Sequence, residues 1–198
     1  MRAFVVAAAL GAAIFAAGQA LAECREADAA MLAMSLHDFD QTETGWRSLD
    51  AKGCERQTAE AIRSYREVNA DALGEDADTL VWHEGQLRAA AGETDEAIRL
   101  MLLGRERDSE ATQPYTDATI AFLRRDREAL LAARARLVAL PMPEAFADAA
   151  ARYAESYPDL PPLTWPLNLS VVDGLIACFD RPYLEAYGCE APAAEGGS

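Results

Sequence analysis

A histidine and two aspartates stand close together near the start of the chain: His37, Asp38 and Asp40. Imidazole and carboxylate groups bind metals and exchange protons, so this cluster could form a metal site or an acid–base pair. The asparagine, glycine and terminal glutamate of a calcium-binding loop are missing, however, and the polar segment 37–45 interrupts a helical pattern. We therefore favour a loop whose polar side chains cap neighbouring helices.

The second histidine of the chain, His83, is followed by Glu84, as in the first half of the zinc-protease motif His-Glu-x-x-His. That motif needs another histidine four residues later, on the same helix face, and this position is Leu87. The chain also lacks the Gly-x-Ser-x-Gly motif of hydrolases, a phosphate-binding loop and a dinucleotide-binding glycine pattern. We therefore expect no metal, no cofactor and no catalytic residues of these classes.

A third candidate is Glu155, followed by Ser156 and Tyr157. This short run resembles the Glu-Ser of lytic transglycosylases, which also carry helical superhelices in the cell envelope. The resemblance implies a glycan-cleaving enzyme whose acid, Glu155, has a raised pKa in a sugar-binding cleft. The Gly-Leu-Met-Gln type of signature that follows in that family is absent here. A helix that ends before Pro158 is the simpler interpretation.

The N-terminus has the pattern of an export signal. A positive start precedes the apolar residues 3–18, and the small residues Ala20 and Ala22 then flank a leucine. This pattern is typical of a signal peptide that is cleaved after Ala22. We therefore expect residues 1–22 to be removed and the mature protein to be periplasmic or secreted in a bacterium.

Four cysteines follow the signal: Cys24, Cys54, Cys178 and Cys189. An even number of cysteines in an exported chain indicates disulfide bonds. Of the three connectivities, the sequential pairing 24–54 and 178–189 is the simplest, because each bond then encloses one compact stretch. A zinc site is the alternative, but no histidine lies at ligand spacing from a cysteine.

Acidic residues dominate the charge of the chain, with 33 aspartates and glutamates against 18 lysines and arginines, a net charge of −15. Such a surface repels nucleic acids and anionic lipids, and it suits a basic partner. We therefore expect no nucleic-acid partner and no membrane association after signal cleavage.

Hydrophobic spacing predicts an all-α chain without a convincing strand pair. We expect helices at residues 24–36, 46–49, 55–69, 78–91, 95–106, 115–124, 126–140, 144–156 and 171–179. Composition predicts a disordered tail at residues 190–198.

One six-residue segment recurs in the middle of the chain. Thr-Ala-Glu-Ala-Ile-Arg at residues 58–63 returns as Thr-Asp-Glu-Ala-Ile-Arg at residues 94–99, 36 positions later, and the same interval separates Trp46 from Trp82. A fixed period of about 34 to 36 residues is typical of stacked helix-turn-helix repeats.

These units resemble the tetratricopeptide repeat family. The matching positions are Trp46-x2-Leu49 with Ala61-x3-Tyr65, Trp82-x2-Gly85 with Ala97-x3-Met101, and, in a weaker third unit, Ala133-x3-Leu137. The closing proline of the family is missing from the first two units. The resemblance implies a single domain, residues 23–189, folded as a right-handed superhelix of about three helical hairpins. The hairpins would span residues 44–72, 78–108 and 115–140, and residues 143–189 would cap the stack.

The resemblance also implies a partner-binding groove. In the family, the residue after the aromatic faces the concave surface, which places Arg47 and His83 there. Leu80, Leu87 and Ala90 share the face of His83 by helical spacing. A register shifted by one residue would instead put Trp82 in the groove and bury His83.

The leading hypothesis is therefore a non-enzymatic periplasmic module that binds a peptide or protein. The alternatives are the glycan-cleaving enzyme and an assembly factor that docks on a larger complex. We expect Trp82 to be a core residue and Trp165 to anchor a proline-rich connector. Phe179, Tyr183 and Tyr187 should pack around the second disulfide bond.

Overall fold

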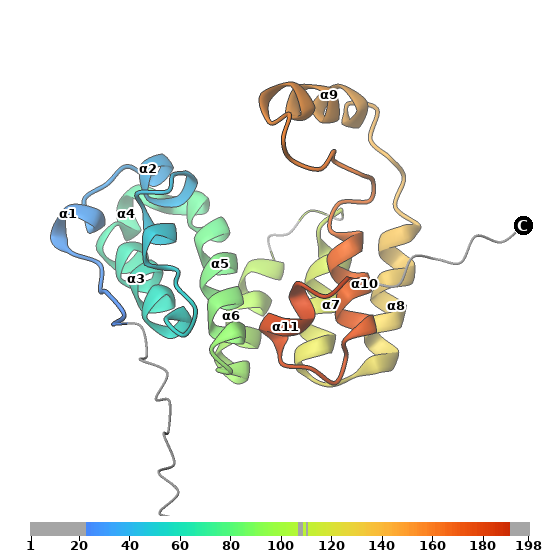
Figure 1. The fold of residues 1–198 in the computed structure, drawn as a ribbon, viewed down its shortest axis with the longest axis horizontal. Helices are drawn as coiled ribbons and strands as arrows, with labels where there is room; N and C mark the ends of the chain where they lie inside the picture. Colours follow the sequence, from blue (N-terminus) through green and yellow to red (C-terminus); the bar gives the residue numbers. More distant parts are fainter. Residues whose placement is uncertain (1–22, 107–108, 110, 191–198) are drawn as a thin grey trace, which may run out of the picture.

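The computed structural model describes residues 23–106, 109 and 111–190, whose regular secondary structure is helical with no strand among them (Figure 1). The all-α class predicted from the sequence is confirmed for this part of the chain. The predicted signal peptide, and all but the first residue of the predicted tail, lie outside the described residues.

The N-terminal segment forms three short helical pieces: α1 (Ala29–Leu32), α2 (Leu36–Gln41) and the 3-10 turn η1 (Trp46–Leu49). The prediction of one helix at 24–36 and a loop at 37–45 is wrong, because two polar residues start new helices. The Asp28 carboxylate accepts from the Met31 amide at 2.8 Å, and the Ser35 hydroxyl accepts from the Asp38 amide at 3.1 Å.

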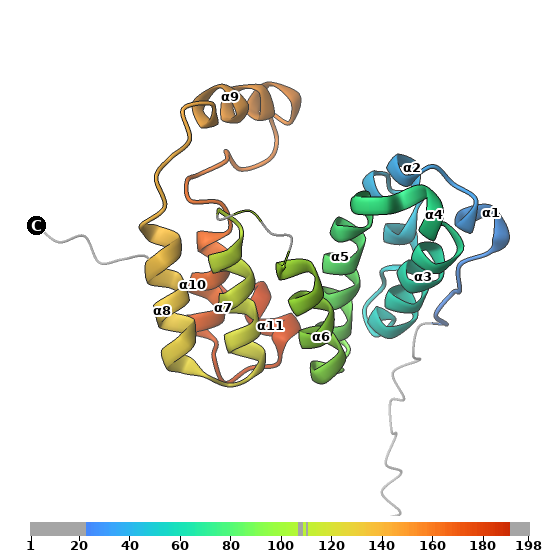
Figure 2. The ribbon, with the colours of Figure 1, turned by 180° about the vertical axis from the view of Figure 1, so that it is seen from behind.

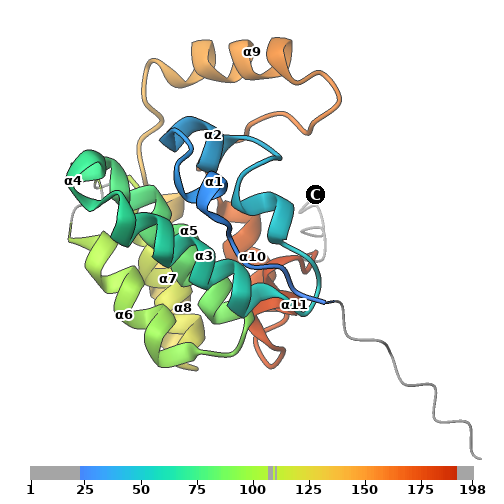
Figure 3. The ribbon, with the colours of Figure 1, turned by 90° about the vertical axis from the view of Figure 1, so that its left-hand side faces the viewer.

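The middle of the chain contains α3 (Glu55–Val68), α4 (Ala70–Leu73), the 3-10 turn η2 (Gly74–Asp76), α5 (Ala77–Ala90) and α6 (Thr94–Arg105). Helix α5 packs against α3 on one side and α6 on the other (Figure 3). A tight turn with Gly92 at a φ of +79° joins α5 to α6, a backbone conformation that favours glycine.

The second half begins with a hairpin of α7 (Gln113–Leu123) and α8 (Arg127–Val138). Helix α10 (Leu169–Ala177) packs on both, and α11 (Tyr183–Tyr187) packs on α10 and reaches α5 (Figure 2). The second and third expected repeat units are therefore helical hairpins. The first is not, because η1 supplies only a single 3-10 turn before α3. The superhelical arrangement stays a prediction.

Two groups of buried apolar side chains form the core. The N-terminal core packs α1, α2, η1 and α3 against α5, with the rings of Phe39 and Tyr65 stacked 3.8 Å apart. The C-terminal core joins α6, α7, α8, α10 and α11. Helix α5 contributes to both, with Leu80 and Leu87 in the first and Ala89 in the second. This helix therefore connects the two halves.

Helix α9 (Phe146–Ser156) stands apart from the other helices between two extended connectors (Figure 1). None of its residues is buried. Trp165 holds the base of this excursion: its ring contacts Phe146, and its indole nitrogen donates to the Leu140 carbonyl at 3.1 Å. Trp165 thus anchors a connector as expected. The cap predicted over 143–189 is made by α10 and α11 alone, because α9 does not cover the core.

Two disulfide bonds join Cys24 to Cys54 and Cys178 to Cys189, with Cα–Cα distances of 5.3 and 6.3 Å. This is the sequential pairing predicted from the sequence. The first bond ties the N-terminal segment to the start of α3, and the second closes the α10–α11 segment.

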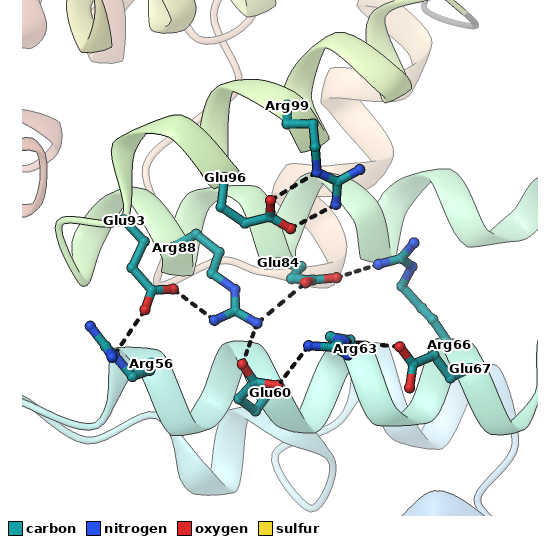
Figure 4. Close-up of polar contacts among 10 residues, drawn as sticks. All are labelled: Arg56, Glu60, Arg63, Arg66, Glu67, Glu84, Arg88, Glu93, Glu96 and Arg99. Carbon is teal, nitrogen blue, oxygen red and sulfur yellow. Dashed lines mark hydrogen bonds and ion pairs between the residues drawn. The ribbon is translucent and has the colours of Figure 1, made fainter.

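A network of ion pairs links α3, α5 and α6 (Figure 4). Glu84 of α5 is fully buried and pairs with Arg66 and Arg88. Arg88, itself buried, also contacts Glu60 of α3 and Glu93 before α6, each at 2.7 Å. Burial raises the pKa of Glu84, and the charges of the two arginines oppose that rise without cancelling it.

The recurring six-residue segment has a structural role in this network. Its glutamate and arginine form the same pair in two successive units: Glu60 with Arg63 on α3, and Glu96 with Arg99 on α6. Both pairs flank the helix that carries Glu84 (Figure 4). The repeat thus places equivalent charged turns on either side of α5.

Candidate functional site

The candidate site is a groove with a volume of about 370 Å³ that lies between the N-terminal core and α11. Aromatic and aliphatic side chains make up most of its wall, and several polar groups lie among them. The lining residues are Trp46, Asp50, Lys52, Glu55, His83, Gln86, Leu87, Ala90, Tyr183, Leu184 and Tyr187. Concave, mostly apolar hollows with a few polar groups are the usual form of binding sites.

Three local features hold α11 at the edge of this groove. The Cys178–Cys189 bond closes the chain around it. A side chain at Gly174 would come within 2.5 Å of the Cys189 carbonyl oxygen, so the absence of one lets the segment pack closely on α10. Tyr183 is buried with its ring near Phe122, at a centroid distance of 6.2 Å. The tyrosines of α11 therefore face α5 from a fixed position.

A buried carboxylate organises the opposite wall. Asp40 Oδ1 accepts from the Trp46 indole nitrogen at 2.9 Å and lies 2.9 Å from His83 Nδ1. The Arg47 guanidinium lies 3.9 Å from the same oxygen and 4.3 Å from the centre of the Trp46 ring. Asp40 thus fixes the orientation of two groove side chains, Trp46 and His83.

These contacts set the charge state of Asp40. Burial alone would raise the pKa of its carboxyl group, but the hydrogen bonds from His83 and Trp46 outweigh burial and lower the pKa to about 2. A carboxylate with so low a pKa keeps its negative charge down to strongly acidic conditions.

The low pKa of Asp40 should make the stability of the protein sensitive to acid. Since the pKa of Asp40 is lower in the folded chain than its ordinary value of 3.8, its contribution is present above about pH 4 and is lost as the pH falls toward 2. We expect Asp40→Asn to reduce the free energy of unfolding at pH 7 by about 2 kcal/mol and to flatten this loss. Denaturant titrations at pH 7, 4 and 2.5 measure both effects.

Asp148→Asn, on the exposed α9, is the matched control and should behave like the parent. An Asp40→Asn protein that still loses stability between pH 4 and 2.5 as steeply as the parent would contradict this assignment.

The structure brings together most of the residues predicted to bind a partner. His83 and Leu87 line the groove, as does Ala90. Arg47 meets His83 through Asp40, although it is not among the groove residues. Leu80 is fully buried in the N-terminal core, so its prediction as a surface contact is wrong. Leu80 and Leu87 lie two turns apart on the same face of α5 and belong to the same core, but neighbouring side chains cover Leu80 completely, whereas Leu87 also lines the groove.

The other chemical candidates have different surroundings. His37 and Asp38 are exposed on α2, where Asp38 accepts from the Ser35 hydroxyl at 2.8 Å. No group of three or more potential metal ligands occurs within the described part of the chain. Glu84 points into the ion network of Figure 4, away from its neighbour His83. Glu155 is exposed on α9 and does not line the groove or the three other hollows described among these residues.

Sequence reasoning missed the contribution of α11. Tyr183 and Tyr187 were expected to pack around the second disulfide bond. Both tyrosines line the groove, and the ring of Tyr183 also lies near that of Phe122. Trp82, predicted to be a core residue, is partly buried with its ring 5.3 Å from that of Tyr115. No periodic signal connects α11 to α5, since nearly a hundred residues separate them.

Within the described ranges, no helix has the length and apolar character needed to cross a membrane. Comparisons of the chain with protein-family models, with curated proteins and with solved structures found no match.

Proposed function

We propose that this protein is a non-enzymatic, exported helical-repeat module that binds a peptide or protein partner in the groove between α5 and α11. The observation that carries the proposal is the composition of that groove: the rings of Trp46, Tyr183 and Tyr187 surround an open hollow next to Leu87 and the exposed Leu184. Aromatic side chains of this kind supply much of the affinity at protein interfaces.

The rigidity of the groove wall supports a binding role. Trp46 and His83 are hydrogen-bonded to the buried Asp40, so little side-chain freedom is lost when a partner arrives. The two disulfide bonds fit an oxidising compartment, as an exported protein requires.

The position of Glu155 favours binding over glycan cleavage. A glycosidase acid acts from a cleft where its pKa is raised, together with a second carboxylate. Glu155 is exposed, on a helix without buried residues. The enzyme hypothesis therefore has no supporting geometry at the residue on which it depends.

The test is a capture experiment with a matched pair of variants. Leu184 on the groove edge and Leu131 on α8 are exposed to a similar degree, at 48% and 45%. We expect Leu184→Asp to weaken capture of envelope proteins or peptides by about tenfold or more, because it places a charge where apolar surface is buried. Leu131→Asp should leave capture unchanged. Calorimetry then measures the affinity of each captured partner for the two variants.

Equal binding by both variants would show that the groove is not the binding surface. Thermal unfolding of each variant is the check on folding, and both should match the parent closely, since both side chains are already exposed.

A further inference from the structure

The rim of the groove carries two carboxylates that form no ion pair with the described part of the chain. Asp50 and Glu55 both line it, on either side of the turn that leads into α3. Glu55 accepts a hydrogen bond from the Gly53 amide at 3.0 Å. Neither residue forms an ion pair within 4 Å among the described side chains, in contrast to the arginines of α3, Arg56, Arg63 and Arg66, each of which pairs with a glutamate.

The two rim carboxylates affect each other. Burial raises the pKa of Asp50, the charge of Glu55 raises it further, and Arg47 opposes both. A cation placed between the two would relieve this repulsion. The site thus has a local preference for positive charge, in a chain whose net charge is −15.

A second feature of the groove points to a ligand independently of charge. Among the described residues, no group bonds to the hydroxyl of Tyr183 with good hydrogen-bond geometry, although this tyrosine is only 6% exposed and lines the groove together with Gln86, the side chain that interacts with it. A buried hydroxyl that lacks a partner costs free energy, and a ligand that bonds to it recovers that cost. A peptide backbone offers both a carbonyl acceptor and an amide donor at this position.

Lys52 lies between the two acids in the sequence and is the only lysine of the chain. It also lines the groove, but it is exposed and forms no ion pair with Asp50 or Glu55 within 4 Å. A lysine ammonium on a flexible stem moves aside at small cost. The groove therefore stays open to a second cation.

We propose that the groove binds an extended peptide segment in which a lysine or arginine stands next to a large apolar residue. The apolar side chain lies against Trp46, Leu87 and Leu184, and the basic side chain reaches the carboxylates of Asp50 and Glu55. The Tyr183 hydroxyl bonds to the peptide backbone. This inference rests on the proposed function, and it adds the chemical class of the partner.

The test uses random heptapeptides displayed on phage, selected on the full-length protein with both disulfide bonds intact. We expect the parent protein to select peptides that pair a basic with a large apolar residue. In calorimetry with one selected synthetic peptide, replacing its basic residue by glutamine should weaken binding by about tenfold. The double variant Asp50→Asn/Glu55→Gln should bind the basic and the glutamine peptide equally.

The control removes two charges elsewhere. Glu144 and Asp148 are exposed at the start of the α9 excursion and form no ion pair with any residue that the structure describes. The variant Glu144→Gln/Asp148→Asn has the same net charge as the rim variant and should keep the full preference for the basic peptide. A preference lost equally in both variants would assign it to overall charge and overturn this inference.

The remaining outcomes separate the inference from the proposed function. Selection of neutral or acidic peptides that no longer bind Leu184→Asp would overturn the cation preference and leave the groove as a binding site. Selected peptides that bind the parent and Leu184→Asp equally would contradict both.

Discussion

Replacing Arg88 by alanine should destabilise the protein by about 3 kcal/mol or more, because it breaks a buried ion network. Arg88 joins three carboxylates, those of Glu60, Glu84 and Glu93, and it is only 5% exposed. Without it, the fully buried Glu84 keeps Arg66 as its one ion-pair partner among the described residues, while the cost of its burial is unchanged. Denaturant unfolding at pH 7 measures the loss.

This destabilisation should also depend on pH in a defined direction. The pKa of Glu84 is already raised in the folded chain, and the loss of Arg88 raises it further. Protonation of Glu84 then removes a buried charge that has lost one of its two arginines, so the stability deficit of the variant should shrink as the pH falls from 7 toward 5.

Arg99→Ala is the matched control for Arg88→Ala. Arg99 and Glu96 both lie on α6, where they form an exposed ion pair, and such pairs contribute at most about 1 kcal/mol to stability. If the two alanine variants lose similar amounts of stability, the buried network contributes no more to stability than an exposed ion pair does.

Replacing Gly45 by alanine should have an effect of similar size for a steric reason. A methyl group at this position would overlap the backbone carbonyl of Phe39, which cannot move aside as a flexible side chain would. The added methyl must push α2 away from η1, and with it the bond between Asp40 and Trp46. We expect a loss of at least about 3 kcal/mol in thermal or denaturant unfolding.

Gly104→Ala provides the comparison. Gly104 lies in the last turn of α6 with open space where a methyl group would lie. Alanine should therefore stabilise the helix by about 0.5 to 1 kcal/mol. A Gly45→Ala protein as stable as the parent would show that α2 and η1 are not packed as closely as described.

The long helices could be predicted because their apolar side chains recur with helical spacing. Helix α3 was expected at 55–69 and occupies Glu55–Val68, and α5 was expected at 78–91 and occupies Ala77–Ala90. The short elements could not, because single contacts decide them. Ser35 starts α2 by capping it, and Gly45 allows η1 to begin directly against the Phe39 carbonyl.

The candidate site could be predicted only in part, for a related reason. His83 and Leu87 follow from the repeat, since both positions belong to one regular helix. Asp40 was assigned to a loop, because nothing in its own segment indicates that a tryptophan and a histidine from elsewhere will contact it. Tyr183 and its neighbours reach the groove through the packing of α10 on the α7–α8 hairpin, which leaves no local pattern.

Both disulfide bonds are local, and this has a consequence for the covalent structure of the protein. One bond spans 30 positions at the N-terminal end and the other 11 at the C-terminal end, so neither crosses the α9 excursion. A protease cut in either connector of α9 would therefore yield two separate chains, even under non-reducing conditions. The groove would then be shared between two molecules, and partner binding would depend on the concentrations of both pieces, as in a split reporter protein.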